Sequence, residues 1–346
     1  MPSSKSVWLD VRSGVNELLL QEYHQQYREE FWSRDEEKPQ MLMFIGGKSK
    51  SISMRRLFAL GRKDEPCKIC LRRVHNEIDP KSPLLIADCG LHNANTLERA
   101  LGGPVPADID QRPIAPTWHE TRSPSDPLEI SILLYGRLIS IFSTVICLFA
   151  DDIGGLDEAA RWVSLWLLAG CQRLDLPHSG YPHVLVLKEW NEDFDHEAAN
   201  FMFMNRLREE TQEKNIERLV AQQFSAVRVI PLPIRNKQKG CDWTTIRELI
   251  QRKSSEVRIR RMEAKLDFSA RQLKALFHAA CDHLAANWES PFSFIAATRS
   301  RNPVPSGFAT HLMNFLRNTS DIKDFAVPII ASALNLDSYP PGMHRK

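Results

Sequence analysis

Glycine and net charge are both scarce in this sequence, and each shortage excludes a class of protein. Gly occurs 15 times and Pro 21 times in 346 residues, without a period, which excludes collagen-like and elastic sequences. The 45 basic and 43 acidic residues leave a net charge of +2, which gives no overall attraction to nucleic acid or anionic membranes. An apolar fraction of 43% is too high for a largely disordered chain. The length favours one large α/β domain plus a smaller one.

Disulfides and a membrane span are also not expected. The seven cysteines are an odd number, and the first residues lack the charged-then-apolar profile of a secretory signal. We therefore expect free thiols or metal ligands in a reducing, cytoplasmic protein. One apolar run, 132–150, is long enough to cross a bilayer, but Arg137 lies inside it. The cost of an intramembrane arginine favours a helix over 127–142 leading into a buried strand over 144–150, and no transmembrane segment.

The hydrophobic pattern divides the chain into three parts. Residues 1–39 carry apolar side chains at helical spacing and predict an N-terminal helical segment. Residues 40–265 alternate short apolar runs with amphipathic stretches, which predicts a doubly wound, mostly parallel α/β sheet with a Pro/Gly-rich insertion over 93–126. Residues 266–346 show no strand pattern and predict an α-helical C-terminal domain. The expected strands of the sheet are 41–45, 83–87, 144–150, 183–187 and 224–232.

The first strand–helix loop has the position of a phosphate-binding P-loop but not its full chemistry. It contains Gly46, Gly47 and Lys48 directly after a buried strand. With Gly46 as the opening glycine, Ser53 stands at the magnesium-binding hydroxyl, while Ile52 replaces the lysine. With Lys48 as the lysine, the preceding loop is too short to wrap a phosphate. In either register we expect triphosphate affinity and catalysis to fall sharply.

The order of these units over residues 40–265 resembles the G domain of Ras-like P-loop GTPases. Asp88 stands where that family has DxxG, with the glycine one place early, and Lys188 is what remains of the guanine-reading NKxD motif. The stretch 225–227 stands near the SAK-type loop and lacks its lysine. The resemblance implies a degenerate nucleotide site, without a catalytic residue, at Gly46, Gly47, Lys48, Ser53, Asp88 and Lys188. Because each loop that binds phosphate or guanine in that family is incomplete here, bound GTP and Mg²⁺ are not expected. For the same reason we predict a protein that is not an enzyme.

A second resemblance covers nearly the whole chain. Stretches such as PLLIADCGLHNANTL and RNPVPSGFATHLMNFL resemble the region before the lipase domain in multidomain patatin-like phospholipase proteins of filamentous fungi. The sequence contains no GxSxG motif, so the resemblance implies an accessory region. It implies a non-catalytic regulatory or interaction protein with a protein partner, expected to be a patatin-like lipase. The alternatives are a weakly active GTPase-type hydrolase and a truncated part of a patatin-like phospholipase.

Two cysteine-containing pairs have the spacing of a zinc site. Cys67 and Cys70 form one pair, and Cys89 and His92 form a second pair 18 residues later. Zinc takes four nitrogen or sulfur ligands, and two ligands three positions apart can share one turn. The pattern predicts a structural Cys3His zinc site, with His75 as a substitute ligand. The alternative is a CxxC motif without metal.

Two further groups are predicted to be structural. Asp151 and Asp152 follow a buried strand, where capping of a helix by solvated acids is favoured over a magnesium or phosphate role. His278, Cys281 and His283 belong to one amphipathic helix. Because their spacing does not place all three on one face, we expect them to pack in the core rather than to bind metal.

Overall fold

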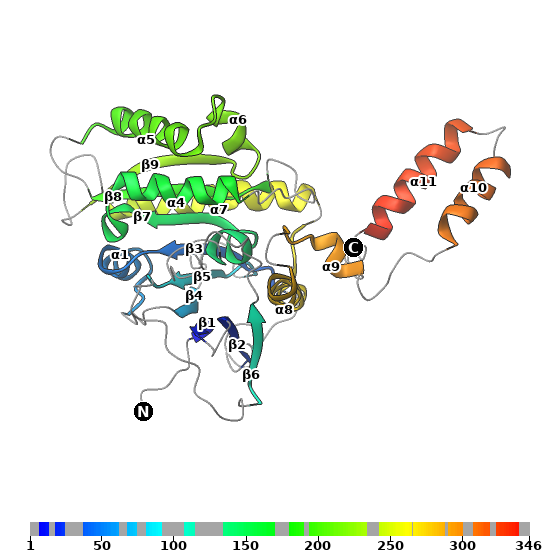
Figure 1. Ribbon diagram of the computed structural model, residues 1–346, viewed down its shortest axis with the longest axis horizontal. Helices are drawn as coiled ribbons and strands as arrows, with labels where there is room; N and C mark the ends of the chain where they lie inside the picture. The colour runs from blue at the N-terminus through cyan, green and yellow to red at the C-terminus, as the bar shows by residue number, and fades with distance from the viewer. Residues whose placement is uncertain are drawn as a thin grey trace, which may run out of the picture. The chain divides into compact units, whose positions relative to one another are not determined.

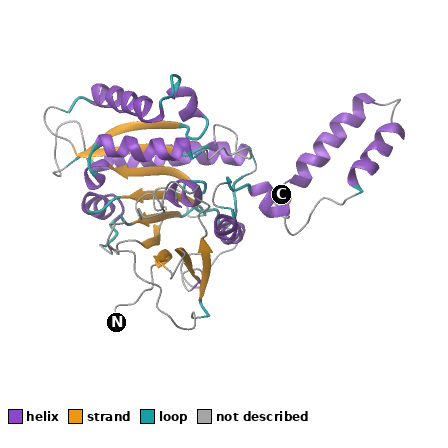
Figure 2. Cartoon of the chain, viewed as in Figure 1, coloured by secondary structure: helices purple, strands orange, loops and turns teal. Residues whose placement is uncertain are grey.

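The computed structural model describes residues 7–13, 18–24, 37–61, 68–74, 81–91, 107–114, 134–169, 180–189, 194–233, 242–264, 266–287, 290–299, 307–318 and 323–338. The chain divides into two compact units, Met1–Phe292 and Ser293–Lys346. The first unit contains a nine-stranded sheet with helices on its faces (Figures 1 and 2). The described residues of the second unit form mainly helices, as predicted.

The strands of the sheet have the order β6-β2-β1-β4-β5-β3-β7-β8-β9. They are β1 (Val7–Ser13), β2 (Leu18–Tyr23), β3 (Gln40–Ile45), β4 (Lys68–Val74), β5 (Leu84–Cys89), β6 (Ile109–Ile114), β7 (Ser143–Phe149), β8 (His183–Glu189) and β9 (Ala226–Leu232). From β5 to β9 along this order the neighbours are parallel. From β6 to β5 they are antiparallel. The fold is therefore α/β with a mixed sheet.

The helices occupy both units. In the first unit they are α1 (Lys48–Phe58), the π-helix η2 (Tyr135–Ile139), α3 (Ala150–Ile153), α4 (Leu156–Leu168), α5 (His196–Thr211), α6 (Ile216–Ala221), α7 (Trp243–Glu263) and α8 (Ala270–Ala286). In the second unit they are α9 (Phe294–Arg299), α10 (Phe308–Asn318) and α11 (Lys323–Ser338). No helix in the described part of the chain is long and apolar enough to cross a membrane.

The parallel half of the sheet is confirmed as predicted, within two residues at each strand end. Its strands are buried along almost their whole length because helices cover them. On one face, strand side chains such as Phe44 and Phe149 form a core with Leu57 of α1 and Ile250 of α7. On the edge strand β9, the side-chain amide of Asn200 in α5 bonds to the backbone of Val229 at both its N–H and C=O. This contact covers polar backbone that would otherwise be open to pairing with another chain.

The prediction of a helical segment over 1–39 is wrong for residues 7–13 and 18–23, which form the antiparallel pair β1–β2. These strands add to β4 and bury Trp8, Leu9 and Leu20 almost completely. The apolar spacing in this stretch is compatible with either helix or strand over so few residues. Pairing with β4 and burial within the unit stabilise the strand conformation of this stretch.

The predicted boundaries of the insertion and of the C-terminal domain also need correction. Within 93–126 the structure describes 107–114, where Ile109–Ile114 form edge strand β6 rather than loop. The predicted start of a separate domain at 266 is wrong, because α8 belongs to the first unit. A capping box at Ser269 begins α8, and Phe277 packs against the indole ring of Trp8 with a centroid separation of 4.8 Å.

Candidate metal centre

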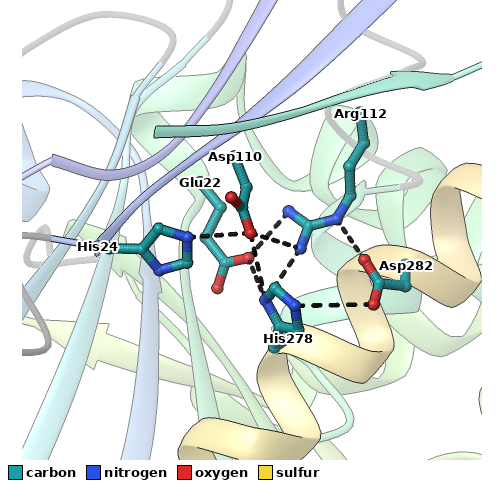
Figure 3. Close-up of polar contacts among 6 residues, drawn as sticks. All are labelled: Glu22, His24, Asp110, Arg112, His278 and Asp282. Carbon is teal, nitrogen blue, oxygen red and sulfur yellow. Dashed lines mark hydrogen bonds and ion pairs between the residues drawn. The ribbon is translucent and has the colours of Figure 1, made fainter. Parts of the chain in front are cut away.

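Six polar side chains meet where β2, β6 and α8 come together (Figure 3). We call them the β2–β6–α8 cluster: Glu22, His24, Asp110, Arg112, His278 and Asp282. In the antiparallel β2–β6 pair, Glu22 lies opposite Asp110 and Leu20 lies opposite Arg112. Alternate residues of a strand share one face, so the two strands project these side chains to the same side of the sheet. His24 directly follows β2, where its backbone N–H donates to the Asp108 carbonyl at 2.8 Å.

Helix α8 brings the remaining two side chains to this face. Its apolar side, which includes Leu276 and Cys281, is buried against the unit. His278 and Asp282 are four residues apart and therefore share a face of the helix. The imidazole of His278 is 41% exposed and contacts the polar side chains of β2 and β6. The prediction of core packing is thus confirmed for Cys281 and wrong for His278.

Three members of the cluster offer donor atoms for one metal ion. The donors of His24, Asp110 and His278 all lie within 4.8 Å of one another, and no other such group occurs among the described residues. His24 Nε2 is 2.9 Å from Asp110 Oδ2, and His278 Nδ1 is 3.6 Å from the same oxygen. Zinc bonds of about 2.0–2.2 Å place tetrahedral donors roughly 3.3 Å apart. Both of these separations are close to that spacing.

Arg112 holds the carboxylates of the cluster in place. Its guanidinium contacts Glu22 at 2.9 Å, Asp282 at 2.5 Å and Asp110 at 3.3 Å. Glu22 is only 1% exposed, so its charge needs this partner. Three carboxylates and one guanidinium leave a cluster charge of −2 while both histidines are neutral. Two protons or one divalent cation would therefore neutralise the charge of the cluster.

The protonation of His278 reflects this negative charge. A hydrogen bond with Glu22, 3.2 Å from Nδ1, raises the pKa of His278 above its ordinary value, against the opposing effect of burial. Nδ1 of His278 also lies 2.9 Å from Nη2 of Arg112. The guanidinium donates a hydrogen bond to Nδ1 when Nδ1 carries no proton. Nδ1 therefore has a hydrogen-bond partner both with and without its proton. A histidine nitrogen must lose its proton before it binds a metal ion.

The predicted zinc site is described only in part. Cys67 and His92 lie outside the described residues. Cys70 and Cys89 are buried on neighbouring strands, where Cys70 pairs with Asp88 and Cys89 with Ile69. Successive strand residues point to opposite faces, so this register directs the two thiols to opposite sides of the sheet. Burial raises the pKa of the Cys89 thiol well above its usual value. The four-ligand site stays a prediction.

The side chains predicted to contact a nucleotide are bound within the protein or point to solvent. Lys48 is exposed at the start of α1. The hydroxyl of Ser53 is buried and donates to the Ser49 carbonyl of the same helix at 2.7 Å. Lys188 pairs with Asp151. The structure therefore does not bring these three side chains together around one ligand position.

Asp88 is likewise committed to an internal network that the sequence did not reveal. Its carboxylate contacts Lys50 Nζ at 2.7 Å and Arg72 Nη2 at 2.8 Å. Lys50, which no motif singled out, is 2% exposed and also donates to the Cys89 carbonyl at 2.8 Å. Asp88 therefore compensates two buried cations and is not open to a magnesium ion.

The start of α1 is occupied by a carboxylate of the chain itself. Asp152, predicted to be a solvated capping acid, accepts backbone N–H bonds from Gly47, Ser49 and Lys50 at 2.7, 2.8 and 2.9 Å. These amides and the helix dipole favour an anion at this point. A Cβ at Gly46 would lie 2.7 Å from Asp152 Oδ2, so glycine is needed for this close approach. The predicted phosphate position is filled by Asp152.

Replacing Asp152 by Ala is expected to lower the free energy of unfolding by about 1–3 kcal/mol, because three backbone donors lose a charged acceptor. Urea unfolding followed by tryptophan fluorescence measures the change. As a control, Asp157→Ala removes an acid that is 88% exposed in the first turn of α4 and should change stability by less than about 0.5 kcal/mol. Equal effects of the two variants would contradict the capping role of Asp152.

Comparison with known proteins gives few matches. No protein-family model matches the sequence, and neither does any curated protein. Among solved structures, Est1E from Butyrivibrio proteoclasticus matches at 11% identity and a TM-score of 0.28, over 72% of this chain and 98% of that chain. The siderophore hydrolase EstB from Aspergillus nidulans matches at 10% identity and a TM-score of 0.25, over 74% and 96% of the two chains. Scores this low establish neither a common fold nor an activity.

The predicted function needs correction. The prediction is a non-catalytic regulatory or interaction protein on a degenerate P-loop GTPase-like scaffold, accessory to patatin-like lipid hydrolases. Its alternatives are a weak GTPase-type hydrolase and a lipase fragment. This function is wrong, and the solved structures that match are Est1E and a siderophore hydrolase instead. The structure gives a physical reason on the nucleotide side, because Asp88, Lys188 and the start of α1 are all engaged internally.

Proposed function

We propose that the protein binds one divalent transition-metal ion, with zinc the first candidate, through His24, Asp110 and His278. The observation that carries the proposal is the convergence of these three donors, from β2, β6 and α8, within 4.8 Å. Two imidazoles and a carboxylate form a ligand set that zinc and similar divalent ions favour. The cluster charge of −2 with neutral histidines is the charge that a divalent ion neutralises.

The surroundings of the three donors also suit a metal. Asp282 Oδ2 lies 3.8 Å from His278 Nε2, and a carboxylate beside a ligating histidine orients the ring and raises its basicity. Arg112 fixes the carboxylates of both β2 and β6. Three protein ligands leave a fourth position of a tetrahedral ion open to water or to an added ligand, as in catalytic rather than structural zinc sites.

We also propose that the first unit has the doubly wound, P-loop NTPase-like arrangement expected from the sequence. The support is the parallel strand order β5-β3-β7-β8-β9, with α1 following β3. This proposal concerns the fold alone, because Asp152 occupies the start of α1. A reducing, cytoplasmic location is supported by the free, buried thiols of Cys70, Cys89, Cys147 and Cys281.

Metal content tests the proposed function directly. Protein purified without chelators is expected to contain zinc or to take up one equivalent by titration calorimetry, and the double variant His24→Ala/His278→Ala should lose that equivalent. His283→Ala removes a histidine from the same helix that contacts Ser290 instead of the cluster, so it should keep the metal. Cys70→Ser removes one ligand of the predicted cysteine site, and so distinguishes zinc bound there from zinc bound by the cluster. Zinc binding by the wild type that is unchanged in the double variant, with Cys70→Ser also present in both, would remove the proposal.

A further inference from the structure

One side of the cluster opens into a pocket with a basic wall. The pocket has a volume of about 340 Å³ and is lined by Glu22, His24, Arg271, Lys274, Ala275 and His278. It therefore contains two of the three proposed metal ligands, His24 and His278. Arg271, Lys274 and His278 follow one another at i, i+3 and i+7 and share a face of α8.

The other side of the cluster has the opposite character. A second hollow of about 300 Å³ is lined by residues of β6 and α8 that include Asp110, Asp282 and His278, so it also contains two of the three proposed ligands. The guanidinium of Arg112 in this hollow contacts these two carboxylates and Glu22. An added anion meets two carboxylates there. In the first pocket, the carboxylate of Glu22 is 1% exposed and already paired, so the exposed charges are those of Arg271 and Lys274.

We infer that the open position of the metal faces the pocket of Arg271 and Lys274 and takes an anionic oxygen ligand, a carboxylate or a phosphate group. This inference rests on the proposed metal site. One oxygen of the ligand binds the metal, and a second contacts the guanidinium of Arg271 or the ammonium of Lys274. A planar guanidinium suits both kinds of oxyanion.

Anion binding in this pocket should depend on the metal. Without metal and with both histidines neutral, the cluster carries −2 and repels an anion, whereas a divalent ion cancels this charge and adds a bond. Coupling between two ligands typically changes affinity by about 5–150-fold. We expect metal-loaded protein to bind inorganic phosphate or acetate at least 10-fold more tightly than metal-free protein.

The test combines two titrations of the full chain by calorimetry, first with zinc and then with phosphate or acetate. Arg271→Gln/Lys274→Gln is expected to keep the zinc affinity and stoichiometry of the wild type and to lose at least 10-fold in anion affinity. Arg55→Gln/Arg56→Gln removes two exposed charges from α1 and should leave both affinities unchanged. A preference for phosphate over acetate identifies a phosphate group, and equal affinities identify a ligand class that includes carboxylates.

The two proposals fail in different ways. Zinc binding without metal-dependent anion binding overturns this inference and leaves the metal site intact. An anion affinity that is equal in the Arg271→Gln/Lys274→Gln variant and the wild type also overturns it. A wild-type protein that binds no zinc overturns both proposals, and the first titration shows this before any anion is added.

Discussion

Replacing Asp88 by Ala is expected to lower the free energy of unfolding by about 3–5 kcal/mol, the cost of breaking a buried ion pair from one side. The carboxylate is 4% exposed and lies between the side chains of Lys50 and Arg72, whose side-chain atoms alone are 3% and 10% exposed. Its removal takes away the carboxylate that both buried cations contact. Urea unfolding at neutral pH, followed by circular dichroism, measures the loss.

A matched surface pair provides the control for Asp88. Glu209, 67% exposed, contacts Arg206 at 3.0 Å on α5, and exposed pairs of this kind contribute about 0–1 kcal/mol. Glu209→Ala should therefore have a small effect. Lys50→Met added to Asp88→Ala should recover part of the lost stability, because the buried ammonium that has lost the Asp88 carboxylate is then gone. A loss below about 1 kcal/mol in Asp88→Ala would show that the carboxylate is not structural.

Replacing His278 by Ala is expected to weaken zinc binding by at least 100-fold at about pH 8. This exceeds the roughly 10–100-fold cost of losing a side chain that only supports a ligand, because a donor atom itself disappears. For the wild type, free zinc at 100 times the dissociation constant should stabilise the fold by about 2.7 kcal/mol. Thermal unfolding with and without zinc measures both effects, and His283→Ala should behave like the wild type.

The pH dependence of stability should change sign when metal is added. The pKa of His278 is raised by Glu22 in the folded protein. Without metal, its stabilising contribution is fully present below the unfolded pKa of about 6.5 and is lost as the pH rises through the folded value. With zinc the imidazole must be deprotonated, so the metal stabilises more at about pH 8 than at about pH 5.5.

This reversal separates metal binding from simple ion pairing. The experiment compares thermal unfolding in chelator and in zinc at the two pH values, for the wild type and for His278→Ala. The variant should lose both the low-pH contribution of the metal-free protein and the high-pH contribution of zinc. A zinc effect that is independent of pH and unchanged in the variant would show that zinc binds elsewhere.

The sequence by itself determined the parallel half of the sheet and the helical nature of the C-terminal part. Apolar runs such as those of β3 and β7 are buried on both faces, so burial leaves a continuous local signal. Helices α4 and α7 alternate with these strands in the regular order that a parallel sheet requires. The buried, free state of Cys147 and Cys281 likewise agrees with the expectation of thiols without disulfides.

Only the tertiary structure decided the antiparallel half and the candidate metal centre. Spacings of two in Glu22–His24 and Asp110–Arg112, and of four in His278–Asp282, indicate shared faces but not that the three faces meet. That meeting depends on the pairing of β2 with β6 and on α8 packing beside them. In the same way, Asp152 reaches the start of α1 across 105 residues of sequence. Local patterns report burial, whereas strand register and long-range charge pairing depend on contacts between distant segments.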